Sequence, residues 1–162
     1  MLVVRTFNQQ DYPDVKRIYQ QGIDTGNATF QTVAKDWLEW DSSMLKCCRL
    51  VAVQDKLILG WAALSPISSR QVYSGVAEVS VYLAKSAQGK GIGHLLLSKL
   101  ITDSESNHIW TLQAGIFPEN EASIELHKKN GFRIIGVREK FGQMGPLWRD
   151  VVLMERRSKL IG

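Results

Sequence analysis

The stretch that decides the fold of this chain is Ala87-Gln88-Gly89-Lys90-Gly91-Ile92-Gly93, a glycine-rich loop between an expected strand and an expected helix. Glycines allow the backbone to approach a ligand closely, and a helix N-terminus presents unpaired N–H groups at the positive end of its dipole. Lys90 adds a full positive charge to this loop. The segment therefore predicts an anion site suited to a pyrophosphate.

Two common phosphate-binding loops do not fit this segment. A P-loop needs Ser or Thr directly after its lysine, and neither follows Lys90. A dinucleotide fingerprint needs glycine at the position of His94, after a strand that opens the domain. The pattern that does fit is Gln/Arg-x-x-Gly-x-Gly/Ala, which is met by Gln88, Gly91 and Gly93.

The elements on either side of the loop follow from their hydrophobic periods. Residues 77–83 alternate apolar and polar side chains and predict a strand, whereas residues 91–102 have helical spacing. Further strands are expected over 2–5, 49–53, 57–64, 109–117, 133–140 and 148–155, and further helices from Asp11 (a candidate N-cap), over 35–45 and over 119–130. Loops are expected over 22–30, 66–75 and 142–146. The element order β-α-α-β-β-β-α-β-α-β-β predicts an α/β (α+β) fold, a mixed central sheet flanked by helices on both faces.

Composition limits the class of protein without naming its function. The 162 residues, 44% hydrophobic and 22% charged, correspond to one ordinary globular domain, residues 1–162, and exclude disordered, collagen-like and disulfide-scaffold proteins. The net charge of +4 favours an anionic ligand but is too small to indicate nucleic acid, and no basic stripe with interleaved aromatics is present.

Nothing in the sequence indicates a membrane segment, export or a metal site. The longest apolar run has eight residues, and no signal peptide is evident, so we expect a cytoplasmic protein without membrane contact. The only cysteines, Cys47 and Cys48, are adjacent and form no metal set, so no metal is expected.

The loop pattern resembles the acyl-CoA pyrophosphate loop of the GNAT acetyltransferases, and the resemblance spans nearly the whole chain. Within that family the chain is most similar to the phosphinothricin/methionine sulfoximine acetyltransferase branch. The matching blocks are Asn27-Ala28-Thr29-Phe30, Gly60-Trp61-Ala62, Glu78-Val79-Ser80-Val81-Tyr82, Pro118-Glu119-Asn120-x-Ala122-Ser123 and Trp148-Arg149-Asp150. The resemblance implies the GNAT acyl-CoA N-acyltransferase fold, acetyl-CoA as co-substrate and a homodimer.

The resemblance also implies where acetyl-CoA binds. The backbone of residues 81–83 would pair with the pantetheine arm like an extra strand, and the loop amides would hold the pyrophosphate. The implied cofactor-binding residues are Val81, Tyr82, Leu83, Gln88, Gly89, Lys90, Gly91, Ile92, Gly93, His94, Asn120 and Ser123. Independently, Asn120, Ser123 and His127 are spaced i, i+3, i+7 and so share one helix face.

Two residues are candidates for proton transfer. Acetyl transfer needs a neutral amine, and Glu78, at the start of the central strand, is the candidate general base. The leaving thiolate could take a proton from an acid. Many GNAT enzymes have tyrosine at the position of His127, whereas the phosphinothricin branch tends to have histidine, so the identity of the acid stays open.

The expected acceptor is a small amine resembling an amino acid, acetylated directly within a ternary complex. Its binding residues are expected to be Phe30, Arg70 and Tyr73, with Arg70 reading a carboxylate. The branch tends to carry two arginines in the loop over residues 66–73, but in this chain Ser68 takes the first position. Two alternatives remain open: a peptide or protein N-acetyltransferase with an open acceptor groove, and a non-catalytic acyl-CoA sensor.

Overall fold

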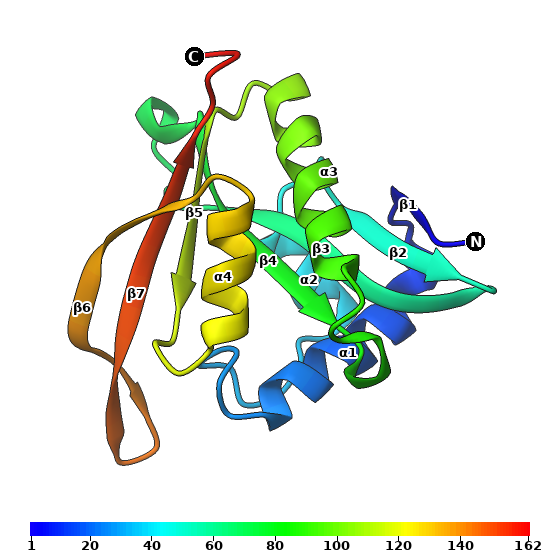
Figure 1. Ribbon diagram of the computed structural model, residues 1–162, viewed down its shortest axis with the longest axis horizontal. Helices are drawn as coiled ribbons and strands as arrows, with labels where there is room; N and C mark the ends of the chain where they lie inside the picture. The colour runs from blue at the N-terminus through cyan, green and yellow to red at the C-terminus, as the bar shows by residue number, and fades with distance from the viewer.

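The computed structural model describes residues 1–162 and has a mixed sheet of seven strands in the order β1-β2-β3-β4-β5-β7-β6 (Figure 1). The strands are β1 (Val3–Thr6), β2 (Leu50–Gln54), β3 (Leu57–Pro66), β4 (Val76–Leu83), β5 (Thr111–Ile116), β6 (Arg133–Met144) and β7 (Leu147–Arg157). The helices are α1 (Tyr12–Asp24), α2 (Trp37–Ser43), α3 (Ile92–Ser106) and α4 (Glu121–Lys129), with short 3-10 turns η1 (Gln9–Asp11), η2 (Gln71–Tyr73) and η3 (Lys85–Ala87). None of these helices is both long and apolar enough to span a membrane.

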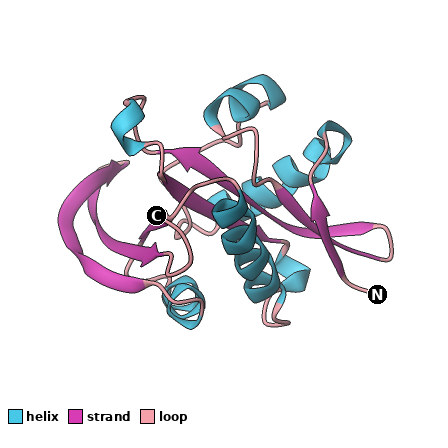
Figure 2. Ribbon diagram, turned by 90° about the horizontal axis from the view of Figure 1, so that it is seen from above, coloured by secondary structure: helices cyan, strands magenta, loops and turns pink.

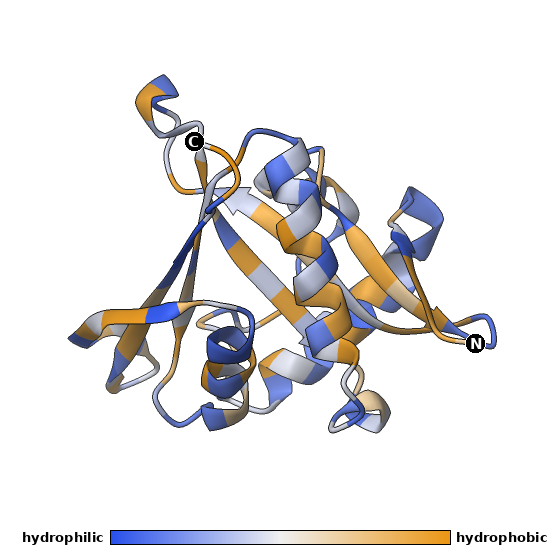
Figure 3. Cartoon of the chain, turned by 45° about the horizontal axis from the view of Figure 1, so that its top comes forward, coloured by the Kyte–Doolittle hydropathy of each residue, from blue (hydrophilic) through white to orange (hydrophobic).

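Helices cover both faces of the sheet, which confirms the predicted mixed sheet between two helical layers (Figure 2). On one face, Tyr19 of α1 and Trp40 of α2 pack against Trp61 of β3. On the other face, α3 runs so close to the sheet that a side chain at Gly60 would meet Leu96. Hydrophobic residues follow the strands at the centre of the sheet (Figure 3).

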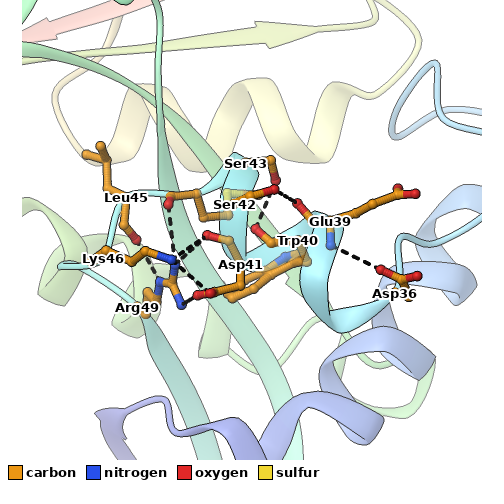
Figure 4. Close-up of polar contacts among 10 residues, drawn as sticks. Asp36, Glu39, Trp40, Asp41, Ser42, Ser43, Leu45, Lys46 and Arg49 are labelled. Atoms are coloured by element: carbon orange, nitrogen blue, oxygen red, sulfur yellow. Dashed lines mark hydrogen bonds and ion pairs between the residues drawn. The ribbon is translucent and has the colours of Figure 1, made fainter.

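A buried arginine ties α2 to the start of β2 (Figure 4). Arg49 donates to a carboxylate oxygen of Asp41 at 2.7 Å and to the backbone oxygen of Leu45 at 2.6 Å. Its guanidinium also lies 4.9 Å from the ring centroid of Trp40. These contacts satisfy the C-terminal end of α2 and hold it against the sheet.

The central feature of the sheet is the divergence of its two parallel strands, β4 and β5 (Figure 1). They pair only at Val76 with Thr111, Ala77 with Leu112 and Glu78 with Gln113. β4 continues to pair with β3 as far as Leu83, so its other edge is unpaired after Glu78. A strand with an unpaired edge presents backbone donors and acceptors to a ligand.

Most element boundaries differ from the sequence expectation by a few residues. α1 continues to Asp24, into the expected loop, and α2 begins only at Trp37, because Asp36 caps it by accepting from the N–H of Glu39. β6 and β7 are longer than expected and meet at a two-residue turn, Gly145 and Pro146.

Asp11 precedes α1 as expected, but its side chain does not cap that helix. Its carboxylate instead accepts from Arg5 at 2.8 Å and from the N–H of Asn8 at 2.9 Å, which lowers the pKa of Asp11. The side chain thus ties β1 to the turn before α1.

Candidate active site

A pocket of about 340 Å³ lies where β4 and β5 diverge. Its volume is in the range of sites for small molecules. The lining residues come from the α1–α2 loop, β4, β5, the β5–α4 loop, α4, β6 and β7: Ala28, Thr29, Phe30, Glu78, Val79, Ser80, Val81, Tyr82, Ala114, Gly115, Ile116, Phe117, Asn120, Ser123, His127, Arg138, Phe141, Val151 and Leu153.

Glu78 is the only carboxylate that lines this pocket, and it lies at the last paired position before the strands separate. Its side chain is half-buried, and Gln113 Nε2 donates to its Oε1 at 3.3 Å. One carboxylate oxygen is thus held by β5 while the group still borders the pocket. This arrangement can accept a proton from a bound amine, directly or through water.

The unpaired edge of β4 runs along the pocket from Val79 to Tyr82 and continues to Leu83. Because β5 has turned away, the backbone N–H and C=O groups on this side have no neighbouring strand. An extended, amide-containing arm fits here as an additional strand.

The glycine-rich loop follows at the end of β4. Gly89 and Gly91 have φ of 76° and 79°, and no atom lies within 4 Å of a Cβ built at either, so their backbone faces open space. No side chain caps the N-terminus of α3, which leaves its first-turn N–H groups available to an anion, with exposed Lys90 beside them. Free strand edge and free amides together fit an acyl-CoA, whose arm carries amides and whose other end carries a pyrophosphate.

α4 brings Asn120, Ser123 and His127 to the pocket, as their spacing predicts. Asn120 is the N-cap of α4: its Oδ1 accepts from Ser123 N at 3.3 Å, and its Nδ2 donates to Asn27 O at 3.2 Å. It therefore joins α4 to the α1–α2 loop across the pocket.

His127 is buried, and its hydrogen bonding defines its tautomer. Nδ1 lies 2.7 Å from the carbonyl oxygen of Ser123, which only accepts, so Nδ1 carries the hydrogen of the neutral ring. Nε2 is buried without a partner, and the ring packs edge-on against Phe132. Burial lowers the pKa of His127, and the hydrogen bond to Ser123 opposes this only in part.

Aromatic side chains build the other wall of the pocket. Phe30 packs edge-on against Phe117, with ring centroids 4.8 Å apart. It also lies against the backbone of β6 at Gly142, where a Cβ would come within 2.3 Å of the ring. Arg138 and Phe141, also on β6, complete this side.

Arg149 holds that wall in place from behind. This buried side chain of β7 donates to Asn27 Oδ1 at 2.8 Å, to Glu119 Oε2 at 3.1 Å and to the backbone oxygen of Gly26. Its guanidinium lies 3.7 Å from the centroid of the Phe117 ring. One residue thus connects β7, the β5–α4 loop and the α1–α2 loop.

The pocket brings together seven of the residues singled out from the sequence: Phe30, Glu78, Val81, Tyr82, Asn120, Ser123 and His127. Leu83 and residues 88–94 do not line the pocket: Leu83 ends β4, and residues 88–94 form the glycine-rich loop and the start of α3. Arg70 and Tyr73 do not line the pocket of this chain: they lie at η2, where the Arg70 guanidinium is 5.6 Å from the Tyr73 ring.

Sequence reasoning missed Arg138, Phe141 and the role of Arg149. β6 reads as an ordinary strand, so nothing in its pattern shows that two of its side chains line a pocket at the divergence of β4 and β5. The sequence signal for Arg149 was its place in the Trp148-Arg149-Asp150 block; its side chain is buried, and a buried arginine needs partners.

Comparison with known proteins agrees with this geometry. The family model described as "Acetyltransferase (GNAT) family" matches residues 12–132. The phosphinothricin N-acetyltransferase of Alcaligenes faecalis is 35% identical over 159 residues, covering 94% of this chain and 81% of that protein. The L-methionine sulfoximine/L-methionine sulfone acetyltransferase of Pseudomonas aeruginosa is 27% identical over 158 residues, covering 94% and 92%.

Solved structures give the same result. The phosphinothricin acetyltransferase of Sinorhizobium meliloti, crystallised in complex with AcCoA, superposes with a TM-score of 0.88 at 27% identity, covering 96% of this chain and 88% of that one. One conclusion follows from the diverging pair of parallel strands, the glycine-rich loop before α3 and the family model that matches residues 12–132. This chain belongs to the acetyltransferase (GNAT) family.

Proposed function

We propose that this protein is an acetyl-CoA-dependent N-acetyltransferase that acetylates the amine of a small substrate resembling an amino acid, such as phosphinothricin or methionine sulfoximine. The observation that carries the proposal is the pocket at the strand divergence. It joins the free edge of β4, where the acyl donor fits, to Glu78, where the acceptor amine needs a base. The relatives named above act on substrates of this class by their names.

In this proposal, acetyl-CoA supplies the acetyl group as a thioester. Glu78 accepts a proton from the acceptor ammonium, which frees the nitrogen lone pair to form the new N–C bond as the C–S bond breaks. The nitrogen then carries one proton more than the amide needs, and this proton passes to the departing CoA thiolate, directly or through water. A backbone N–H on the free edge, between Val79 and Val81, donates to the carbonyl oxygen as negative charge develops there. Transfer is direct, since neither cysteine lines the pocket.

We propose a role for His127 other than that of the general acid that protonates the CoA thiolate. Its single N–H is already donated to the Ser123 carbonyl, so it could protonate the thiolate only by losing that bond or after gaining a second proton. The lowered pKa opposes the second route. We therefore assign His127 to positioning α4 and Ser123, and the thiolate of CoA leaves without an acid from this residue.

The shape of the pocket favours a small acceptor over a peptide or a protein. Phe30 and Phe117 line the acceptor side and Arg149 holds the loop beside them, whereas an extended peptide substrate needs a groove along the surface. A non-catalytic sensor would have no use for a carboxylate held at the strand divergence by Gln113.

The proposal includes a homodimer. β6 is an edge strand of the sheet, and it exposes Ile134, Ile135, Val137 and Phe141, each by 44% or more. A long apolar edge of this kind favours association with a second copy. Light scattering after size exclusion should then give about twice the mass of one chain, and a monomer at micromolar concentration would exclude this part.

The experiment that tests the proposed function compares the wild type, Glu78→Gln and the control Glu125→Gln, an exposed residue of α4 outside the pocket. With acetyl-CoA and a panel of amino-acid analogues, we expect acetylated product from the wild type and the control. Loss of the base should lower kcat by about 100-fold or more in Glu78→Gln. Unchanged turnover in Glu78→Gln would remove it as the base, and a wild type that acetylates no amine would refute the function.

A further inference from the structure

The charges of the pocket point to a feature of the acceptor beyond its amine. Two of the side chains that line the pocket are ionic, the carboxylate of Glu78 and the guanidinium of Arg138, whereas burial lowers the pKa of His127 and so favours its neutral ring. One is an anion on β4 and the other a cation on β6. A substrate that satisfies both must itself carry a cation and an anion.

Arg138 has no partner within the chain. The other arginines pair with carboxylates or donate to backbone oxygens, apart from Arg70 at η2. Arg138 has no such contact, and its guanidinium instead lies 4.6 Å from the ring centroid of Phe141. Stacking on a ring uses none of the N–H groups, so all five stay free for a ligand.

A bulge in β6 puts these two side chains together. Arg138 pairs with Val151 and Gly142 with Arg149, so β6 has two more residues than β7 over this interval. Asp150 fixes the bulge by accepting from the N–H of Lys140 at 2.8 Å. Bulges redirect side chains, and here Phe141 supports the guanidinium at the pocket.

We infer that Arg138 is the specificity-determining residue that binds the anionic group of the acceptor, a carboxylate in an α-amino acid. The inference rests on the proposed function and adds to it the residue that recognises the acid group of an acceptor resembling an amino acid. Arginine matches a carboxylate by two parallel N–H donors, and an α-amino acid carries its ammonium and carboxylate on one carbon. Glu78 then serves the ammonium end and Arg138 the acid end.

This assignment replaces Arg70 in the role expected from the sequence. Both arginines are exposed and unpaired, but only Arg138 shares the pocket with Glu78. If Arg138 binds the carboxylate, Arg138→Gln raises KM for the acid substrate and Arg70→Gln does not. If Arg70 binds it, the reverse holds.

The test measures KM for L-methionine sulfone and for its carboxamide, which keeps the amine but loses the negative charge. The variants are Arg138→Gln, Arg138→Lys, Arg70→Gln and the control Arg133→Gln, an exposed arginine of β6 outside the pocket. We expect Arg138→Gln to raise KM for the acid by about 10- to 100-fold and to leave KM for the carboxamide and for acetyl-CoA unchanged. Arg138→Lys should fall between, because it keeps the charge without the fork.

A second readout does not depend on turnover. Phosphinothricin or L-methionine sulfone, added with CoA, should raise Tm of the wild type and of Arg133→Gln, and raise it less in Arg138→Gln. Folding of Arg138→Gln is checked by its Tm without ligand and by its kcat for the carboxamide.

The outcomes separate this inference from the proposed function. If the wild type acetylates the acids and Arg138→Gln keeps the same preference for acid over carboxamide, the inference fails and the function stands. If Arg70→Gln, and not Arg138→Gln, lost the preference for acid over carboxamide, the inference would fail in the same way. If the wild type neither acetylates nor binds any acid of the panel, both fall together.

Discussion

The absence of a side chain at Gly142 places the ring of Phe30 against the backbone of β6. A Cβ at Gly142 would lie 2.3 Å from the ring, so Gly142→Ala must displace Phe30 from the acceptor side of the pocket. We expect KM for the acceptor to rise by about tenfold, because a small displacement near a reacting group is costly, while KM for acetyl-CoA stays the same. Gly136→Ala on the same strand has open space and is the control; equal KM in both variants would contradict this placement.

His127 gives the protein a local source of acid sensitivity. Burial lowers its pKa in the folded state, so the unfolded chain binds the proton more readily, and stability is lost as the pH falls below about 6.5. His127→Asn keeps an N–H for the Ser123 carbonyl but does not titrate, so its stability should fall less between pH 7 and pH 5.

Urea unfolding midpoints at pH 7, 6 and 5 measure this difference. His108→Asn is the control, since His108 is exposed and asparagine tolerates its φ of 60°. The control should follow the wild type. A wild type and His127→Asn with parallel midpoints would show that His127 does not titrate differently on folding.

At the scale of elements, Arg149 joins three segments that the strands alone leave separate. Arg149→Met would leave the backbone oxygen of Gly26 and Oδ1 of Asn27 without their donor and would free Glu119. We expect a loss of about 2–3 kcal/mol in the free energy of unfolding, together with a higher KM for the acceptor, because the α1–α2 loop forms the pocket wall. Arg149→Lys should fall between the wild type and Arg149→Met.

Urea unfolding and acceptor kinetics check this prediction. Arg133→Met is the control, because it breaks only an exposed ion pair with Glu155 and should cost less than about 1 kcal/mol. If Arg149→Met lowered stability without a change in KM, Arg149 would support the fold but not the pocket.

The elements that could be predicted are those whose sequence carries a local signal. The alternation in residues 77–83, the glycines of the loop and the helical pattern of residues 119–130 each depend on neighbouring residues, and these elements lie close to where the sequence indicates. The spacing of Asn120, Ser123 and His127 was enough to put them on one face of α4.

The parts that could not be predicted depend on pairing between distant segments. The bulge between Arg138 and Gly142 exists only relative to β7, and the place of Arg70 depends on how the loop after β3 folds away. An exposed arginine looks the same in the sequence whether or not a pocket lies beside it. This is why Arg138 was not among the residues expected from the sequence to contact the acceptor.

At the scale of the whole molecule, the sheet has two halves joined at one narrow seam. β1 to β4 form one half and β5 to β7 the other, and the three β4–β5 pairs between Val76 and Glu78 connect them within the sheet. Past that seam the halves separate, with the pocket between them. A ligand that pairs with the free edge of β4 and contacts α4 would therefore bridge both halves.

Acetyl-CoA should accordingly stabilise the whole domain rather than one loop. At 100 times its Kd, a ligand of the native state adds about 2.7 kcal/mol, which corresponds to a rise in Tm of about 5–11 °C for a domain of this size. Amide hydrogen exchange should slow on β4 beyond Glu78 and on β5 together, since both sides of the seam are held.

Gly91→Ala forces a side chain into a backbone with φ of 79°, and Gly145→Ala does so at 58° in the β6–β7 turn far from the loop. Both variants should lose intrinsic stability, but only Gly91→Ala should also lose most of the acetyl-CoA shift, because only Gly91 lies in the loop expected to bind the pyrophosphate. A Tm rise with protection limited to the start of α3 would show that the ligand binds by its anionic end alone and leaves the two halves unbridged.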